Sequence, residues 1–182
     1  MHRWLWLLLS AALALPLAAR AAGPEAAEKF FAPFLGDLRA ELAEAKSTGR
    51  VGVVAMFHFD DCPYCQRMKA NVLSRPDVQV FYAKRFVAVP IDTRGDTEIT
   101  DFSGKTWKEK DFARSVPIAG TPTFVFYGLD GKPVARHVGE IRDPKEFILL
   151  GEYVATEAWR KQSFKEFLSA RAPSAGTPRQ SQ

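Results

Sequence analysis

The stretch Val51-Gly52-Val53-Val54-Ala55-Met56-Phe57-His58-Phe59-Asp60-Asp61-Cys62-Pro63-Tyr64-Cys65 contains both cysteines of the 182-residue chain. Its first nine residues are mostly apolar, with β-branched and aromatic side chains and no alternation, which predicts a strand buried on both faces of an α/β sheet. Pro63 suits the first turn of a helix, where no backbone N–H is needed. Further on, Cys65, Met68 and Val72 share one helical face. We therefore expect the cysteines where a strand becomes a helix.

Cys62 is expected at the N-terminus of this helix, where unpaired N–H groups and the helix dipole stabilise a thiolate. Lowering a cysteine pKa from ~8.5 to ~7 stabilises the anion by roughly 2 kcal/mol. Cys65, one turn further in, is expected to be the more buried cysteine and the resolving thiol. The alternatives are a structural disulfide, which contributes only ~2 kcal/mol in so short a loop, and half of a zinc site. Zinc needs four ligands, whereas the chain has two thiols and three scattered histidines, so redox chemistry is favoured.

The N-terminus has the pattern of a secretory signal peptide over residues 1–21. A basic start is followed by the apolar run Trp4 to Leu17 and a small-x-small cleavage site at 18–21. An uncleaved membrane anchor is less favoured, because the run is short for a span of ~20 residues and contains Pro16. Export places the chain where disulfides persist, so two neighbouring cysteines favour thiol exchange. Removing Arg3 and Arg20 leaves 23 of the 25 basic residues against 21 acidic ones, an excess too small to indicate nucleic-acid binding.

The rest of the chain predicts one α/β domain over residues 24–171 and a disordered Pro/Ser/Gly/Thr tail over 172–182. Pro90 lies inside an expected strand, which requires its missing N–H to face a sheet edge or a bulge. Hydrophobic periodicity predicts helices over 25–47, 63–73, 78–82, 107–116, 144–154 and 163–171. Apolar runs predict strands over 51–59, 86–92, 123–127 and 133–138, with a small hairpin over 99–105.

With its predicted helices and strands in this sequence order, the chain resembles thioredoxin-fold proteins. Two motifs carry the resemblance. One is Cys62-Pro63-Tyr64-Cys65, and the other is Thr121-Pro122-Thr123 before the turn Asp130-Gly131-Lys132. The resemblance implies a thioredoxin-like α/β fold, with a central mixed sheet of about four strands flanked by helices and with extra C-terminal helices. It also implies a cis peptide before Pro122 that faces the cysteines. Cys62 and Cys65 would be catalytic, Pro63, Tyr64, Thr121 and Pro122 would bind substrate, and no cofactor or metal would be needed.

Four segments resemble SoxW-type periplasmic thioredoxins of sulfur-oxidising bacteria: residues 61–65, 100–104, 121–126 and 163–168. This resemblance implies a monomeric periplasmic protein that reduces an exposed disulfide of a partner protein and receives electrons from a membrane thiol-disulfide donor. Potentials in the fold run from about −270 to about −120 mV, and the Pro-Tyr dipeptide does not fix a place in that range. A thiol oxidase or isomerase, and a non-enzymatic glutaredoxin-like iron–sulfur or binding module, therefore stay open as alternatives.

The chain departs from thioredoxin around the cysteines. The buried acid six residues before the first cysteine of thioredoxin is replaced by Met56, and the tryptophan just before that cysteine is replaced by Asp61. Asp60 and Asp61 are candidates for proton transfer, but solvated turn acids that help to cap the helix are the favoured interpretation. His58 is expected to be a packed, hydrogen-bonded core histidine rather than a general base.

Overall fold

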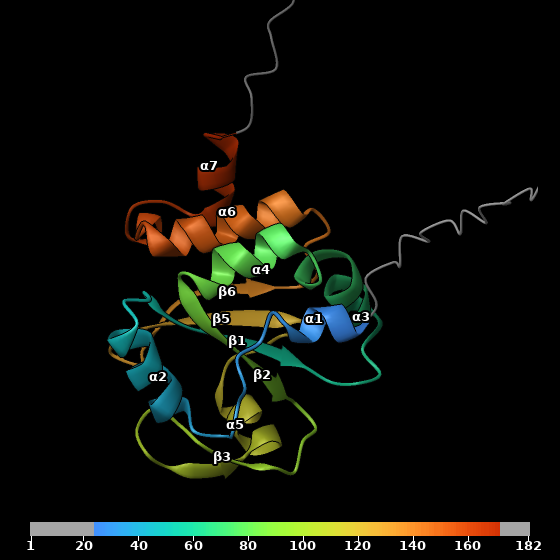
Figure 1. Cartoon of the computed structure of the whole chain (residues 1–182), viewed down its shortest axis with the longest axis vertical. Coiled ribbons are helices and arrows are strands. Elements are labelled where there is room, and N and C mark those ends of the chain that lie inside the picture. The colour runs from blue at the N-terminus through green and yellow to red at the C-terminus, as the bar shows by residue number, and fades with distance from the viewer. Residues whose placement is uncertain (1–23, 172–182) are drawn as a thin grey trace, which may run out of the picture.

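The computed structural model describes residues 24–171 of the chain. Their centre is a mixed sheet with the strand order β2-β1-β5-β6 (Figure 1). β1 pairs with β2 in parallel and with β5 antiparallel, and β5 pairs antiparallel with β6. The bounds are β1 (Gly52–His58), β2 (Phe86–Asp92), β5 (Thr123–Gly128) and β6 (Pro133–Val138). The predicted four-stranded mixed sheet, and the antiparallel return of the chain at residues 133–138, are confirmed.

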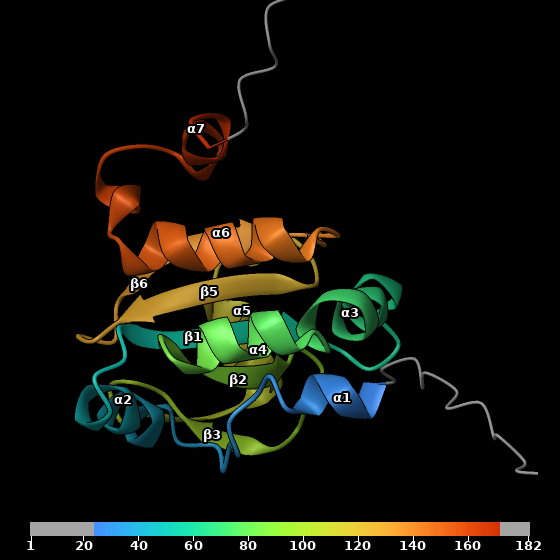
Figure 2. The ribbon, with the colours of Figure 1, turned by 45° about the horizontal axis from the view of Figure 1, so that its top comes forward.

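Helices cover both faces of this sheet, because successive side chains of the central strand point to opposite sides. Val54 and Met56 of β1 belong to the core shared with α1, α3, α4 and α6, whereas Val53, Ala55 and Phe57 belong to the core shared with α2 and α5. Figure 2 shows α4 and α6 on one side of the sheet and α2 on the other. The bounds are α1 (Pro24–Glu28), α2 (Leu38–Ser47), α3 (Pro63–Met68), α4 (Pro76–Ala83), α5 (Glu109–Ser115) and α6 (Pro144–Ala155).

Aromatic side chains fill the first of these cores. Tyr82 of α4 stacks on Phe147 of α6 with ring centroids 4.5 Å apart, and Phe30 and Phe124 also pack against Phe147. Complete burial of one such ring contributes about 1.5–3 kcal/mol relative to exposure. The Tyr82 hydroxyl donates a hydrogen bond of 2.7 Å to the Phe147 carbonyl, so its polar end is satisfied inside the core. This cluster fixes α4 and α6 against the sheet that carries the cysteines.

The predicted helix over 25–47 is wrong, because the structure divides it into α1 and α2. The backbone N–H of Ala32 donates a hydrogen bond of 2.8 Å to the carbonyl of Ala88 on β2, so residues 29–37 follow the edge of the sheet. Gly36 has a φ of 85°, a left-handed conformation that a glycine adopts without strain. Asp37 then caps α2 by accepting a hydrogen bond from the N–H of Arg39.

The predicted hairpin around residues 99–105 is present, but its strands extend further than expected. β3 (Glu98–Thr100) pairs antiparallel with β4 (Thr106–Lys108). Trp107 therefore lies in a strand and not in a helix, and α5 begins at Glu109. The indole N–H of Trp107 donates to the Asp101 carboxylate at 2.7 Å, which holds the strand conformation.

The remaining elements follow the sequence pattern. Pro90 lies in β2, an edge strand of the sheet, as its missing N–H requires. The final elements are η2 (Ala158–Arg160) and α7 (Phe164–Ser169), and the latter begins with a capping box between Ser163 and Glu166. In residues 24–171 no helix is long and apolar enough to cross a membrane. The predicted signal peptide (1–21) and C-terminal tail (172–182) lie outside the described residues.

Candidate redox site

The cysteine pair lies where β1 passes into α3, as the sequence predicts. The N–H of Cys62 donates to the Phe59 carbonyl at 3.2 Å, which closes the turn between strand and helix. Cys62 is the N-cap of α3 and Pro63 occupies its first turn. Cys62 and Cys65 form a disulfide with their Cα atoms 5.2 Å apart. The helix continues as a π-helical turn, η1 (Lys69–Leu73), and its buried side chains include Met68 and Val72.

The second motif meets the cysteines because β5 pairs with β1. Thr123 at the start of β5 is opposite Phe57, so the preceding loop reaches Cys62. The Thr121–Pro122 peptide is cis, as the resemblance to thioredoxins implies. The carbonyl of Pro122 accepts a hydrogen bond of 2.8 Å from the N–H of Gly139, which ties the loop to the end of β6.

Two donors converge on the Cys62 sulfur. The N–H of Cys65 donates to Sγ of Cys62 at 3.1 Å, and the Thr121 hydroxyl donates to the same atom at 3.3 Å. Hydrogen bonds to the charged form of a thiol stabilise the thiolate and lower the pKa. After reduction this arrangement favours a thiolate on Cys62, and the roles of Cys62 as the nucleophile and Cys65 as the resolving thiol stay a prediction.

The expectation that Cys65 is the more buried cysteine is wrong for the disulfide form, since each cysteine is 1% exposed. The loop at Thr121 covers Cys62, and its carbonyl oxygen lies 3.6 Å from the Cys62 sulfur. The two cysteines differ instead in their polar contacts, because Cys62 Sγ accepts both of the hydrogen bonds described above. That difference depends on a loop far away in the sequence.

The rim of the site carries an aromatic side chain and a charged network. Tyr64 is 54% exposed, and the Arg67 guanidinium lies 4.6 Å from its ring centroid. Arg67 also makes two hydrogen bonds of 3.1 Å to the Glu140 carboxylate, which Arg142 approaches to 3.4 Å. The hydrogen bonds from Arg67 lower the pKa of Glu140. This network joins α3 to the loop after β6, and no sequence pattern relates these two segments, because Arg67 and Glu140 are 73 positions apart.

The predicted substrate-binding residues differ in their exposure. Pro63 and Tyr64 are exposed, Thr121 is half-buried and Pro122 is buried. Their contact with a partner stays a prediction.

Met56 occupies the position at which thioredoxin has a buried acid, so this position is apolar in the present chain. Met56 is fully buried and belongs to the same core cluster as Cys62 and Cys65. Asp60 and Asp61 are exposed, as expected for solvated turn acids. Their expected part in capping is wrong, because the side chain that accepts the N-terminal hydrogen bond of α3 is that of Cys62.

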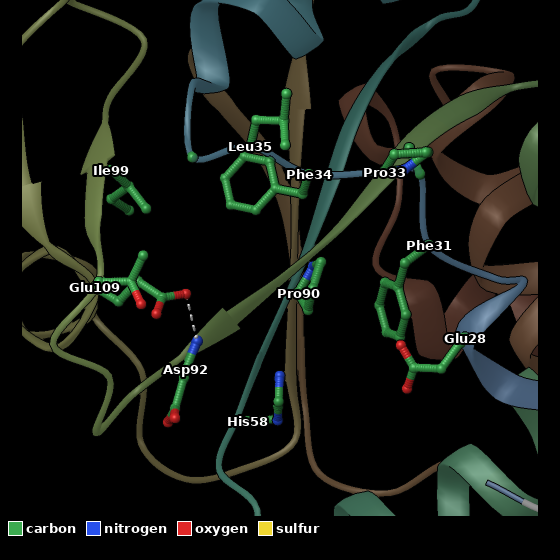
Figure 3. Close-up of a pocket in the computed structure, with 13 residues that line it drawn as sticks. Glu28, Phe31, Pro33, Phe34, Leu35, His58, Pro90, Asp92, Ile99 and Glu109 are labelled. Atoms are coloured by element: carbon green, nitrogen blue, oxygen red, sulfur yellow. Dashed lines mark hydrogen bonds between the residues drawn. The ribbon is translucent and has the colours of Figure 1, made fainter. Parts of the chain in front are cut away.

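His58, the last residue of β1, is packed as predicted and only 8% exposed. The predicted hydrogen bond is absent at one ring nitrogen, since Nδ1 has no partner among the described residues. Burial lowers the pKa of His58, and the charge of Lys69 lowers it further. The lowered pKa favours the neutral form of the ring, which lies at the wall of a cavity shown in Figure 3.

Comparisons with known proteins agree with this geometry. Residues 38–155 match a family model described as a thioredoxin-like domain. A thioredoxin from Thermus thermophilus is 33% identical, with a TM-score of 0.51, over 65% of this chain and 83% of its own. A thioredoxin-fold protein from Helicobacter pylori is similar in fold, with a TM-score of 0.58 and 16% identity, over 80% of this chain and 88% of its own. No curated protein matches the chain significantly.

The family match covers more than half of the chain and includes both the cysteine pair and the loop at Pro122. The site contains the Cys62–Cys65 disulfide, and Cys62 lies at the N-terminus of α3. The Thr121 hydroxyl donates a hydrogen bond to the Cys62 sulfur. The chain therefore belongs to the thioredoxin-like family, and it is a thiol-disulfide oxidoreductase with Cys62 and Cys65 as its redox pair.

Proposed function

We propose that this oxidoreductase works in the reducing direction, as an exported periplasmic protein that reduces an exposed disulfide of a partner protein. The observation that carries thiol exchange at Cys62 is the convergence of the Cys65 N–H and the Thr121 hydroxyl on its sulfur, whereas the reducing direction is supported by the resemblance to SoxW-type thioredoxins. A thiolate stabilised in this way is the attacking species in disulfide reduction. The resemblance of four segments to SoxW-type thioredoxins supports a link to sulfur oxidation, and the N-terminal pattern supports export.

The reaction takes place in two exchanges. The Cys62 thiolate attacks one sulfur of the partner disulfide, a mixed disulfide forms, and the other partner sulfur leaves as a thiolate. Cys65 then loses its proton and attacks the Cys62 sulfur, which restores the Cys62–Cys65 disulfide and releases the second partner thiolate. Two electrons pass to the partner, whose thiolates take up two protons. The Thr121 hydroxyl and the Cys65 N–H stabilise negative charge on the Cys62 sulfur before the first exchange. They do so again whenever this sulfur is the leaving group of an exchange.

The cycle needs a source of two electrons to reduce the Cys62–Cys65 disulfide again. We assign this role to a membrane thiol-disulfide electron donor, because an exported protein has no access to cytosolic reductants. The same two exchanges with the donor's dithiol restore both thiols. The protein acts as a monomer and uses no organic cofactor or metal in this scheme.

Reduction of a protein disulfide such as that of insulin tests the direction and the roles of the cysteines. Reduced wild type should reduce insulin, Cys62→Ser should be inactive, and Cys65→Ser should stop at a mixed disulfide seen on a non-reducing gel. Alkylation of the reduced protein at neutral pH should label Cys62 before Cys65. Faster labelling of Cys65 would overturn the assignment of roles. Faster oxidation of a dithiol peptide than reduction of insulin would establish the oxidase alternative instead.

A further inference from the structure

A hollow of about 450 Å³ lies between the helix that carries the cysteines and the loop after β6. Its lining comes from α3 and η1 on one side and from the loop on the other: Arg67, Asn71, Val72, Glu140 and Arg142. Both arginines and the asparagine are exposed. Guanidinium and amide groups offer N–H donors, which suit an acceptor such as a carboxylate.

The hollow adjoins the loop that covers the Cys62 sulfur. Glu140 directly follows Gly139, whose N–H donates to the Pro122 carbonyl at 2.8 Å. The carbonyl of the preceding residue, Thr121, lies 3.6 Å from Sγ of Cys62. A partner disulfide must come to this sulfur for thiol exchange. The partner residues that flank the reacting cysteine therefore lie close to the hollow during exchange.

Arg67 is fixed in place by contacts within this protein. Its Nε and Nη2 each donate to one oxygen of the Glu140 carboxylate at 3.1 Å, and its guanidinium lies 4.6 Å from the ring centroid of Tyr64. The Glu140 side chain is only 8% exposed, and the hydrogen bonds from Arg67 lower its pKa, so it is ionised at neutral pH. A guanidinium that is already ordered loses little conformational freedom when a partner binds.

The positive charge of this network exceeds its negative charge, because the carboxylate of Glu140 faces two guanidinium groups. Arg142 is 80% exposed, and its Nε approaches Glu140 at 3.4 Å, which is its only ion pair among residues 24–171. The next acid in the chain, Asp143, accepts a hydrogen bond of 2.9 Å from the N–H of Lys145 at the start of α6. Arg67 by itself joins α3 to the loop, so the other N–H groups of Arg142 can bind a partner.

The acids before Cys62 lie at a separate part of the rim. The Asp60 carbonyl accepts a hydrogen bond of 2.8 Å from the side chain of Gln66, whereas the next residue of the helix, Arg67, contacts the loop after β6. Successive side chains of a helix point about 100° apart, so these contacts lie on different sides of α3. The rim therefore has an acidic part near Asp60 and Asp61 and a basic part near Arg67.

We propose that Arg142, beside the fixed Arg67, determines specificity by binding a carboxylate of the partner protein. The favoured partner then carries an Asp or Glu side chain close to its reactive cysteine. Glu140 is a positioning residue, since it orients both arginines. The inference rests on the proposed function in requiring a polypeptide partner, and it holds for either direction of exchange.

Symmetric disulfides of end-blocked peptides with a single cysteine test this inference on the full chain. Reduced protein converts each peptide disulfide into two peptide thiols and forms its own Cys62–Cys65 disulfide, and the rate constant is measured by chromatography. Glu is placed two positions before or two positions after the cysteine, because such side chains of an extended peptide point to the same side as the sulfur. Matched peptides carry Gln instead.

Glu should raise the rate about three- to tenfold over Gln at one of the two positions and not at the other, since the basic part of the rim lies on one side. Added salt should reduce this advantage, because exposed charges are screened. Equal rates for the Glu and Gln peptides, or an equal advantage at both positions, would overturn the proposal.

Arg142→Gln is the decisive variant, because so exposed a side chain is not needed for folding, and it should lose the advantage of Glu. Arg160→Gln is the matched control and should keep it. Arg160 is also exposed and paired with an acid, Glu157 at 3.0 Å, but it lies with Val51 and Gly128 at the other end of the central strands. An undiminished advantage in Arg142→Gln, or its loss in Arg160→Gln, would contradict the assignment.

Failure of the proposed function would give a different result. Reduced wild type would then leave insulin and the Gln peptides unreduced, and this inference would fall with the function. Reduction of insulin and of the Gln peptides without any preference for Glu would overturn the carboxylate subsite alone.

Discussion

Thr121→Val removes one of the two donors at the Cys62 sulfur and keeps a β-branched side chain of nearly the same size. The lost interaction is the hydroxyl hydrogen bond of 3.3 Å to Sγ. A hydrogen bond to a charged group contributes about 1.5–3 kcal/mol, and we take the lower end because sulfur is a weak acceptor. One pKa unit corresponds to about 1.4 kcal/mol, so the pKa of Cys62 in the reduced protein should rise by about one unit. The thiolate fraction at pH 7 should fall up to about tenfold.

The pKa is measured through the ultraviolet absorbance of the thiolate and, independently, through the pH dependence of alkylation at Cys62. Thr121→Ser restores a hydroxyl and should recover most of the shift. Thr123→Val is the matched control, because Thr123 lies two residues further on, at the start of β5, and its hydroxyl donates to the Gly120 carbonyl and not to sulfur. An unchanged pKa in Thr121→Val, or an equal rise in Thr123→Val, would refute the proposed role of the hydroxyl.

Two further predictions concern stability. Partial burial opposes ionisation of Asp101, but hydrogen bonds from Ser103, Trp107 and the Lys105 backbone lower its pKa from 3.8 to about 2. Because the folded pKa is depressed, the stabilisation is complete above pH 4 and is lost as the pH falls toward 2, by at most about 2 kcal/mol since the carboxylate is partly exposed. Urea unfolding over this range should show the loss in wild type and a flatter profile in Asp101→Asn; identical profiles would contradict the prediction. Phe147→Ala should lower the free energy of unfolding by about 3–5 kcal/mol, because its ring is fully buried and packs against other aromatic rings, and a loss below about 1 kcal/mol would count against that core.

The junction that carries the cysteines could be predicted because its signals are local. An apolar run, a CxxC spacing and a proline in the first helical turn all lie within residues 51–65. The cis peptide before Pro122 was available only through resemblance, since no local pattern fixes an isomer. The central mixed sheet of about four strands likewise followed from the resemblance to the family and was confirmed.

Features that depend on distant contacts could not be read from the sequence. The burial of Cys62 depends on Thr121, which is 59 residues away. The division of the predicted helix over 25–47 depends on pairing between Ala32 and Ala88 across the edge of β2. The apolar spacing of the segment alone does not reveal that pairing. The approach of Arg67 to Glu140 has no sequence signal at all, because the two residues are 73 positions apart.

The reduction potential of the Cys62–Cys65 couple tests the central claim most directly. The protein is equilibrated in defined redox buffers, the thiols are trapped by acid and alkylated, and the reduced fraction is measured by mass spectrometry. We predict one reversible two-electron transition nearer to the thioredoxin value of about −270 mV than to the value of about −120 mV of strongly oxidising members of the fold. A transition near −120 mV, or two cysteines that do not titrate as a pair, would contradict a dithiol reductant.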